Sequence, residues 1–322
     1  MSNPTRAQLH TDQILTNLSV SYQQDPGMFI ADIASPIVPV VKQSDKYYIY
    51  DKGDQYRTET AKRAPGTESK GTGWRTSTDT YFADNYSLHQ DIADQDRANT
   101  DAPLNLERDA TEHVMADIRR KKESDWAAAH FVSSTWTGST TAGDITPGNL
   151  WDTVASTPIE DIRAQSTSIL KKTGYVPNTL VMGIDIWDAL IDHADLIDRI
   201  KYTQAADDAS VESIMANVFN VDKILVSRAV QNTGAEEATD SIGVIVGAND
   251  ALLMYTSPNP GVRTRSASIQ FTWSFNGNNS FGTRVSKFRM DELESDRIEV
   301  SSAWDFKRVD VLLGAYFLNA VS

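Results

Sequence analysis

Twenty-five consecutive residues, 54–78, contain almost no large apolar side chain, and this stretch constrains the fold more than any other feature. Tyr56 and Trp74 are its two exceptions. On either side lie runs rich in aromatic residues, at 46–50 (Lys-Tyr-Tyr-Ile-Tyr) and at 80–92, which are typical of β-strands. Compact domains seldom keep so long a loop without a use for it. The pattern therefore predicts an extended hairpin with a long polar tip.

The charge changes sign along this region. Residues 52–76 include six basic and three acidic side chains, net +3, whereas residues 79–117 include ten acidic and two basic ones, net −8. Two separately solvated surfaces would explain the pattern. The alternative is that the basic projection reaches the acidic segment of another copy, where opposite charge steers and orients the contact. The candidate contact residues are Lys52, Arg57, Lys62, Arg63, Lys70, Arg75 and Trp74 on the projection, and Asp91, Asp94, Asp96 and Asp101 on the acidic segment.

The composition excludes several classes of protein. Thirty basic against 44 acidic residues give a net charge of −14, which argues against a protein whose main role is to grip nucleic-acid phosphates. Cysteine is absent, which excludes disulfides, Cys-ligated metal centres and a thiol nucleophile. Residues 1–12 lack the pattern of a signal peptide, and no window approaches about 18 uninterrupted apolar residues. We therefore expect neither an export signal nor a membrane span.

A long helix is expected over residues 104–132, which include neither Gly nor Pro. At 1.5 Å per residue it would span about 40 Å. Asp101 and Pro103 are typical of a helix start. Polar Lys122 interrupts an apolar face, whose residues recur at steps of mainly three or four: Ala110, Val114, Ile118, Trp126 and Ala129.

The segments before and after this helix differ in their predicted secondary structure. Prolines and Pro26-Gly27 break residues 1–45 into short extended pieces, which must lie on another surface to bury their apolar side chains. Residues 157–262 alternate helical and strand patterns and read as an α/β region with its own core. Residues 269–275 then alternate apolar and polar side chains, as in a strand, and 281–290 are expected to return as the partner strand.

No motif indicates catalysis. The glycines at 138 and 143 lack the Lys-Ser/Thr of a phosphate loop, and no nucleophile–base pair can be proposed. Asp185, Asp188, Asp192 and Asp195, with His193 beside them, are spaced to share one helix face. A two-faced surface helix explains this spacing, and a weak cation site or an acidic enzyme site is the alternative. We expect no catalytic residue, cofactor or metal.

The order of elements resembles the tailed-phage major capsid protein, with the Hong Kong 97-type capsid fold that encapsulin shells share. It runs from an extended arm through a long hairpin and one long helix to an α/β lobe and returning strands. The segments that carry the resemblance are 46–50, 81–92, 104–132, 177–182 (Pro-Asn-Thr-Leu-Val-Met), 184–190 (Ile-Asp-Ile-Trp-Asp-Ala-Leu), 269–275 and 281–290.

The resemblance implies an α+β fold with named parts. In that family the arm wraps a neighbour, the hairpin is called the E-loop, and the long helix is the spine of a P-domain. The implied boundaries are an N-terminal arm at 1–45, an E-loop hairpin at 46–92, a P-domain at 93–156, an A-domain at 157–262, P-domain return strands at 263–303 and a C-terminal A-domain segment at 304–322.

The implied function is self-assembly into an icosahedral shell around the double-stranded DNA of a tailed phage. Many copies, as pentamers and hexamers, would enclose DNA without specific binding and without a membrane. Because only about 45 residues precede the hairpin, we expect a separate scaffolding protein, with a portal and a decoration protein as further partners. The shell would be part of the virion, its subunits made in the host cytoplasm, and no lysine cross-link is predicted. An encapsulin-like compartment and, remotely, a soluble α/β enzyme with an acidic site at 185–195 are the alternatives.

Overall fold

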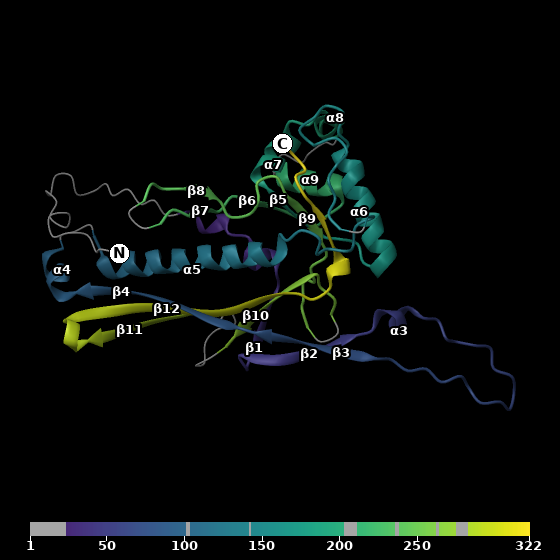
Figure 1. The fold of residues 1–322 in the computed structure, drawn as a ribbon, viewed down its shortest axis with the longest axis horizontal. Coiled ribbons are helices and arrows are strands. Elements are labelled where there is room, and N and C mark those ends of the chain that lie inside the picture. The colour runs from purple at the N-terminus through teal and green to yellow at the C-terminus, as the bar shows by residue number, and fades with distance from the viewer. Residues whose placement is uncertain are drawn as a thin grey trace.

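The structure is a computed structural model that describes residues 24–100, 104–141, 143–202, 211–235, 238–261, 264–274 and 283–322. A five-stranded sheet forms one layer of the molecule (Figure 1), and the long strand β12 (Ser295–Arg308) is its centre. Along one edge, β12 pairs first with β11 (Thr283–Met290) and then with β10 (Ser268–Trp273). Along its other edge it pairs with β4 (Asp84–Ala93).

The length of β12 corrects one expectation about the strand order. Residues 269–275 and 281–290 were expected to pair with each other, but β10 and β11 pair instead with successive parts of β12. With 14 residues, β12 is long enough to accommodate both strands on one edge. A short parallel strand, β1 (Ile37–Val40), completes the sheet beside β10.

The predicted long helix is α5 (Leu106–His130), which lies along the sheet (Figure 1). Its 25 residues span about 38 Å. Asn105 caps its start by accepting a hydrogen bond from the backbone N–H of Arg108 at 3.1 Å. Asp101 and Pro103, the expected start, lie outside the described residues. The predicted apolar face is confirmed, since Ala110, Val114, Ile118 and Trp126 are buried.

The inner part of the arm lies on its own chain. Helix α2 (Ala31–Ala34) packs on α5, and Ile30, Ala31 and Ala34 are buried there. Two consecutive residues of α5 hold it: Glu123 accepts hydrogen bonds from the N–H groups of Ile30 and Ala31, and Lys122 pairs with Asp32. Lys122 thus interrupts the apolar face because it binds the arm. Residues 1–23, the rest of the segment expected to wrap a neighbour, lie outside the described residues.

The expected α/β region forms a lobe with a four-stranded sheet in the order β13-β9-β5-β6, and its core is continuous with the one beneath α5. Every residue of β5 and β9 is buried, which gives the lobe its core. The lobe's elements are β5 (Thr179–Gly183), β6 (Lys223–Ser227), β9 (Ala251–Met254), β13 (Gly314–Phe317), α6 (Pro158–Thr173), α7 (Ile184–Ile191), α8 (Ala194–Tyr202) and α9 (Val211–Phe219). Residues 304–308, expected in this lobe, instead continue β12, and β13 is the C-terminal strand that joins it.

The hairpin divides at Ala83. Strands β2 (Ser44–Tyr50) and β3 (Thr76–Phe82) pair as a two-stranded ribbon, whereas β4 belongs to the five-stranded sheet. The run at 80–92 is therefore two strands with different partners. Tyr81 of β3 packs on Phe271 of β10, whereas Tyr86 of β4 stacks on Trp304 of β12, so each part of the run follows its own apolar contact.

Candidate assembly surfaces

The ribbon is anchored to the five-stranded sheet through its inward face. The rings of Tyr47 and Tyr81 contact Phe271, with centroid separations of 5.6 and 4.5 Å. The Tyr47 hydroxyl donates a hydrogen bond to Asp79 across the ribbon at 2.7 Å. Burial and this bond raise the pKa of Tyr47 well above its usual range. The ribbon is thus a fixed platform from which the polar loop leaves the molecule.

The two legs of the loop are tied together at its base. A single helical turn, α3 (Lys52–Tyr56), follows the ribbon and is capped by Asp51. Asp54 in this turn accepts hydrogen bonds from the backbone N–H and the Nε of Arg75 on the returning leg, at 3.0 and 2.9 Å. The Arg75 guanidinium holds the pKa of Asp54 below its usual range. This tie fixes where the loop begins.

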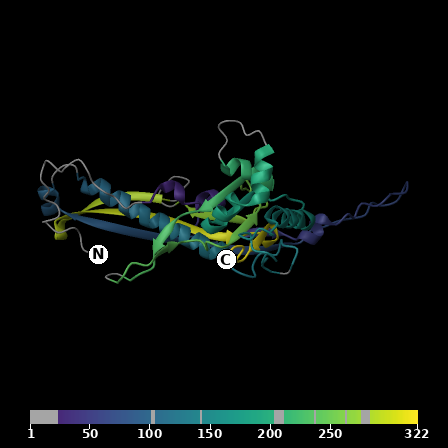
Figure 2. The same cartoon turned by 90° about the horizontal axis from the view of Figure 1, so that it is seen from above.

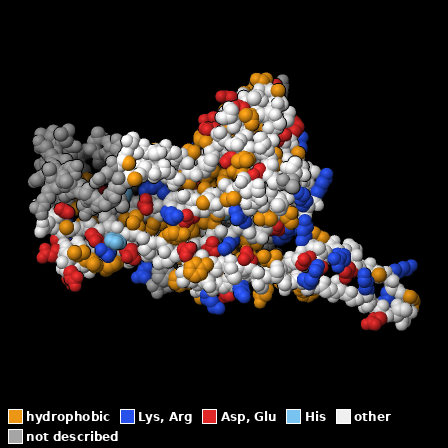
Figure 3. All heavy atoms as spheres, viewed as in Figure 1, with side chains coloured by type: hydrophobic (Ala, Val, Ile, Leu, Met, Phe, Trp, Pro, Cys, Tyr) orange, Lys and Arg blue, Asp and Glu red, His pale blue; other side chains and the backbone are white. Residues whose placement is uncertain are grey.

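From residue 60 onward, the tip of the loop buries nothing within its own chain. Residues 60–80 are all exposed, and the ring of Trp74 is 66% exposed. Figure 2 shows the loop extending away from the rest of the molecule, and Figure 3 shows basic side chains gathered along it. Arg57 and Arg75 form ion pairs inside the loop. Within the described part of the chain no ion pair is formed by the other basic candidates, Lys52, Lys62, Arg63 and Lys70.

Three of the acidic candidates, Asp91, Asp94 and Asp96, lie at the opposite end of the molecule, at or just before α4 (Asp94–Asn99) (Figure 1). Asp91 accepts two hydrogen bonds from Arg297, at 2.6 and 2.7 Å. Asp94 likewise accepts two from Arg289, at 2.7 and 2.6 Å. Each arginine holds the pKa of its carboxylate below the usual range.

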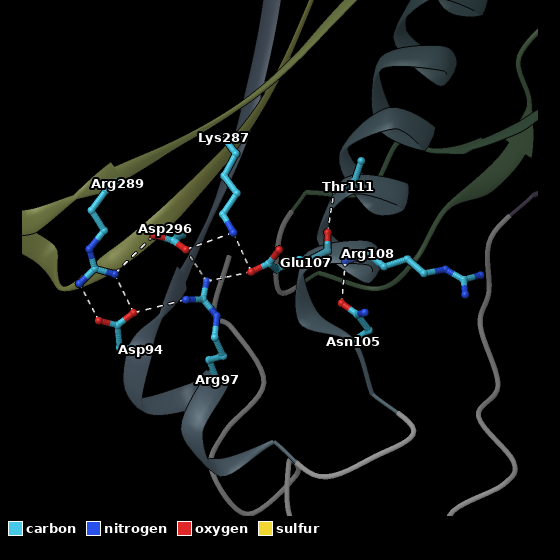
Figure 4. Close-up of polar contacts among 9 residues, drawn as sticks. All are labelled: Asp94, Arg97, Asn105, Glu107, Arg108, Thr111, Lys287, Arg289 and Asp296. Atoms are coloured by element: carbon cyan, nitrogen blue, oxygen red, sulfur yellow. Dashed lines mark hydrogen bonds and ion pairs between the residues drawn. The ribbon is translucent and has the colours of Figure 1, made fainter.

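The Asp94–Arg289 pair extends into a network that joins three parts of the chain (Figure 4), since Arg289 also lies 3.4 Å from Asp296. Asp296 of β12 binds Arg97 of α4 at 2.7 Å and Lys287 of β11 at 3.3 Å. Glu107 of α5 binds the same two cations, at 3.2 and 2.8 Å. The network therefore fastens α4 and the start of α5 to the end of the sheet.

Because of these ion pairs, the acidic segment 79–117 presents less free negative charge than its sequence alone indicates. The return strands supply Lys287, Arg289 and Arg297, which form ion pairs with Glu107, Asp94 and Asp91, three of the ten acidic residues in 79–117. Asp96 has no ion pair within the described residues, and Asp101 lies outside them. Because the basic loop and the acidic segment lie at opposite ends, they do not meet within one chain.

The acidic residues near 185–195 do not share one helix face. The chain breaks between α7 and α8, with Asp192 as the C-cap of α7 and His193 between the helices. His193 is buried and lies 2.9 Å from the Ser156 hydroxyl, a pair that the sequence did not indicate. Among the described residues, no group of three His, Asp or Glu side chains is placed to hold a metal ion.

The contacts of this Ser–His pair show its role. His193 Nδ1 accepts a hydrogen bond from the backbone N–H of Asp195, which favours the neutral tautomer that donates its Nε2 proton to Ser156. The Ser156 hydroxyl in turn donates to the carbonyl of Thr153. A histidine that donates to the serine does not act as its base. The pair links the segment before α6 to the break between α7 and α8.

No helix among the described residues combines the length and apolar character needed to cross a membrane.

Comparisons with known proteins place the chain among capsid proteins. The family model described as phage major capsid protein E matches residues 137–298, which span the lobe except β13, the strands β10 and β11, and the start of β12. The major capsid protein of Burkholderia phage BcepMu is 25% identical over 292 residues, covering 89% of this chain and 91% of that protein.

Solved structures share the fold along nearly the whole chain. A phage-related protein from Bordetella bronchiseptica RB50 superposes with a TM-score of 0.69 at 21% identity, covering 92% of this chain and 93% of that one. The mature capsid of bacteriophage PhiM1 gives a TM-score of 0.62 at 12% identity, covering 96% and 92%. The SrpI encapsulin of Synechococcus elongatus PCC 7942 also shares the fold, at 10% identity and a TM-score of 0.59 over 100% and 98% of the two chains. The Hong Kong 97-type fold is confirmed, and it is common to virion and encapsulin shells.

Proposed function

The chain belongs to the phage major capsid protein E family and is a shell-forming protein of a virion, and we propose that its copies meet through the projecting loop. The shell is icosahedral and encloses double-stranded DNA, as the resemblance to tailed-phage capsid proteins implies. The observation that carries the proposal is that residues 60–75 are all exposed and form a long loop on a fixed platform. Such a segment has few apolar contacts in one chain and becomes ordered by contact with a neighbour.

The charges support a contact between the loop of one copy and the far end of another. Lys62, Arg63 and Lys70 have no ion pair within the described residues, and the opposite end of the chain holds Asp91, Asp94 and Asp96. Two of these carboxylates already bind arginines, so the contact gains orientation from the charges more than affinity. A head-to-tail contact forms a ring when the rotation from copy to copy closes, which is the arrangement that pentamers and hexamers require.

The net charge suits a container for DNA. At −14, the chain repels a polyanion overall, so the shell encloses DNA without binding it tightly. We also propose that the subunit has three further partners: a separate scaffolding protein, a portal and a decoration protein. The subunit is made in the host cytoplasm.

Two other functions have less support. An encapsulin shares only the fold, whereas the family model and the curated relative both name a phage capsid protein. An enzyme would need a reactive group. In the buried Ser156–His193 pair, the serine hydroxyl donates to the Thr153 carbonyl, so the histidine is not arranged to remove its proton. We infer that the subunit has no enzymatic activity.

The test is a charge reversal in the loop, with assembly as the readout. The triple variant Lys62→Glu, Arg63→Glu, Lys70→Glu is expected to reduce the yield of shells or rings, sized by gel filtration and seen by negative stain. Expression with and without the phage's scaffolding protein covers both routes of assembly. The matched control reverses three exposed cations elsewhere, Arg119, Arg163 and Lys171, with the same change in net charge. If the loop variant assembles like wild type with the same salt dependence, the proposed contact is wrong.

A further inference from the structure

The base of the loop is fastened to the lobe by one tyrosine. The hydroxyl of Tyr56, the last residue of α3, donates a hydrogen bond to the carbonyl of Thr173, the last residue of α6. The same hydroxyl accepts a hydrogen bond from Nη1 of Arg265 at 2.6 Å. The contact joins residues that are 117 and 209 positions apart in the chain.

Arg265 is itself fixed on several sides. It binds Asp310, which lies just beyond the end of β12, through Nε at 2.9 Å and through Nη2. Its Nη1 also donates to the Thr173 carbonyl at 3.1 Å. The guanidinium lies over the rings of Tyr175 and Tyr56, 5.5 and 6.0 Å from their centroids. We call the group Tyr56, Thr173, Arg265 and Asp310 the latch.

The latch uses a group that the fold leaves unsatisfied. The last four carbonyls of a helix have no partner within the helix, and Thr173 ends α6 before Gly174 turns the chain at a φ of 77°. The Thr173 carbonyl therefore provides an acceptor at a fixed place on the lobe. Tyr56 brings the loop to it, and Arg265 binds both groups while Asp310 holds it in place.

The position of the latch gives it control over the loop's direction. Tyr56 lies two residues beyond Asp54, where the two legs are tied, and the exposed tip at 60–75 begins four residues after Tyr56. The ribbon sets the point of departure, but a second contact on the lobe is needed to set the angle at which the loop departs.

We propose that Tyr56 and Arg265 are positioning residues that aim the projecting loop, so that its direction follows the position of the lobe. The inference rests on the proposed function, in which the loop is the contact with another copy. A loop held at one angle meets its neighbour without paying the entropy of searching for it. A change in the lobe's position moves the loop through the same contact.

The test measures the loop's direction in the unassembled subunit. The chain has no cysteine, so Ser69→Cys and Lys171→Cys place two spin labels, one on the loop tip and one on α6, without other attachment sites. Pulsed electron–electron double resonance then gives the distribution of distances between the label on the loop tip and the label on α6. Tyr56→Phe, which removes only the hydroxyl, should raise the unlatched population roughly five-fold and broaden the distribution. Arg265→Met should broaden it further.

The controls separate aiming from folding. Tyr48→Phe removes the same atom from an exposed tyrosine of the ribbon and should leave the distribution unchanged. Arg265→Lys should recover part of the narrow distribution, because an ammonium retains the charge but not the planar fork that binds several acceptors. Circular dichroism confirms that each variant is folded.

Each outcome bears on one claim. If folded Tyr56→Phe and Arg265→Met proteins keep the wild-type distribution, the latch does not aim the loop and the inference is overturned. If the distribution broadens and shell yield falls, both the inference and the proposed function stand. If it broadens while assembly is unchanged, the latch stands and the loop is not the contact between copies.

Discussion

Replacing Glu123 by Gln should remove a pH dependence of stability that the arm's attachment creates. The Glu123 carboxyl is fully buried between α5 and α2, and its Oε2 accepts hydrogen bonds from the N–H groups of Ile30 and Ala31 at 3.1 and 2.9 Å. Its Oε1 has no hydrogen-bond partner among the described residues. Burial, offset in part by the two N–H groups, raises the pKa of Glu123 to about 7.

The sign and size of the effect follow from this pKa. Because the pKa is higher in the folded protein than in the unfolded chain, its contribution is complete below about pH 4.5 and is lost as pH rises through 7. The difference of about 2.5 pKa units corresponds to roughly 3 kcal/mol, of which about 2 kcal/mol falls between pH 5.5 and 8.5. Gln does not titrate, so the stability of Glu123→Gln relative to wild type should grow by about 2 kcal/mol over this range. Any constant cost of the buried amide cancels in that comparison.

The assay is urea unfolding of the unassembled subunit, followed by circular dichroism at several pH values from 5.5 to 8.5. Glu112→Gln is the matched control, because it makes the same substitution at an exposed position of α5. Stability curves of wild type and Glu123→Gln that run parallel across this range would refute the reasoning from burial.

Two further perturbations test the core. Burial lowers the pKa of His130 to about 4, so stability should fall by about 1 kcal/mol from pH 7.5 to 5.5 through this group, opposite in sign to Glu123. His130→Phe should remove that loss in thermal unfolding, and an unchanged slope would contradict it. A Cβ on Gly314 would lie 2.2 Å from Cε3 of Trp136, so Gly314→Ala should cost about 1–3 kcal/mol by overpacking. Gly243→Ala is the control, because a Cβ there meets nothing within 4 Å. Equal melting temperatures for the two variants would show that the Trp136 side chain moves aside without cost.

The sequence predicted the parts of the fold that local patterns determine. The apolar spacing from Ala110 to Trp126 is a property of one helix, and α5 follows it. The polar run at 54–78 likewise predicted the projecting loop, because side chains without apolar surface have no core to join.

Contacts between distant segments could not be predicted in this way. Asp91 finds Arg297 at a separation of 206 residues, and Asp94 finds Arg289 at 195, so the charge counted along the chain was not the charge of the surface. The break at His193 was missed for a related reason. Helical spacing of the aspartates continues through it, but the side chain of His193 turns inward to Ser156 and ends the helix pattern.

The length of β12 has a mechanical consequence. Its 14 residues extend about 46 Å without a break, with Asp296 of the charged network at one end and Asp310 of the latch two residues beyond the other. An extended strand can lengthen very little, and β12 is held by hydrogen bonds to β4 on one edge and to β11 and β10 on the other. It can therefore transmit tension along its length. Under the proposed latch, a pull on the loop of one copy would reach that copy's far end through Asp310 and β12. In a closed shell, internal pressure would be shared by the whole lattice of subunits and not borne by single contacts.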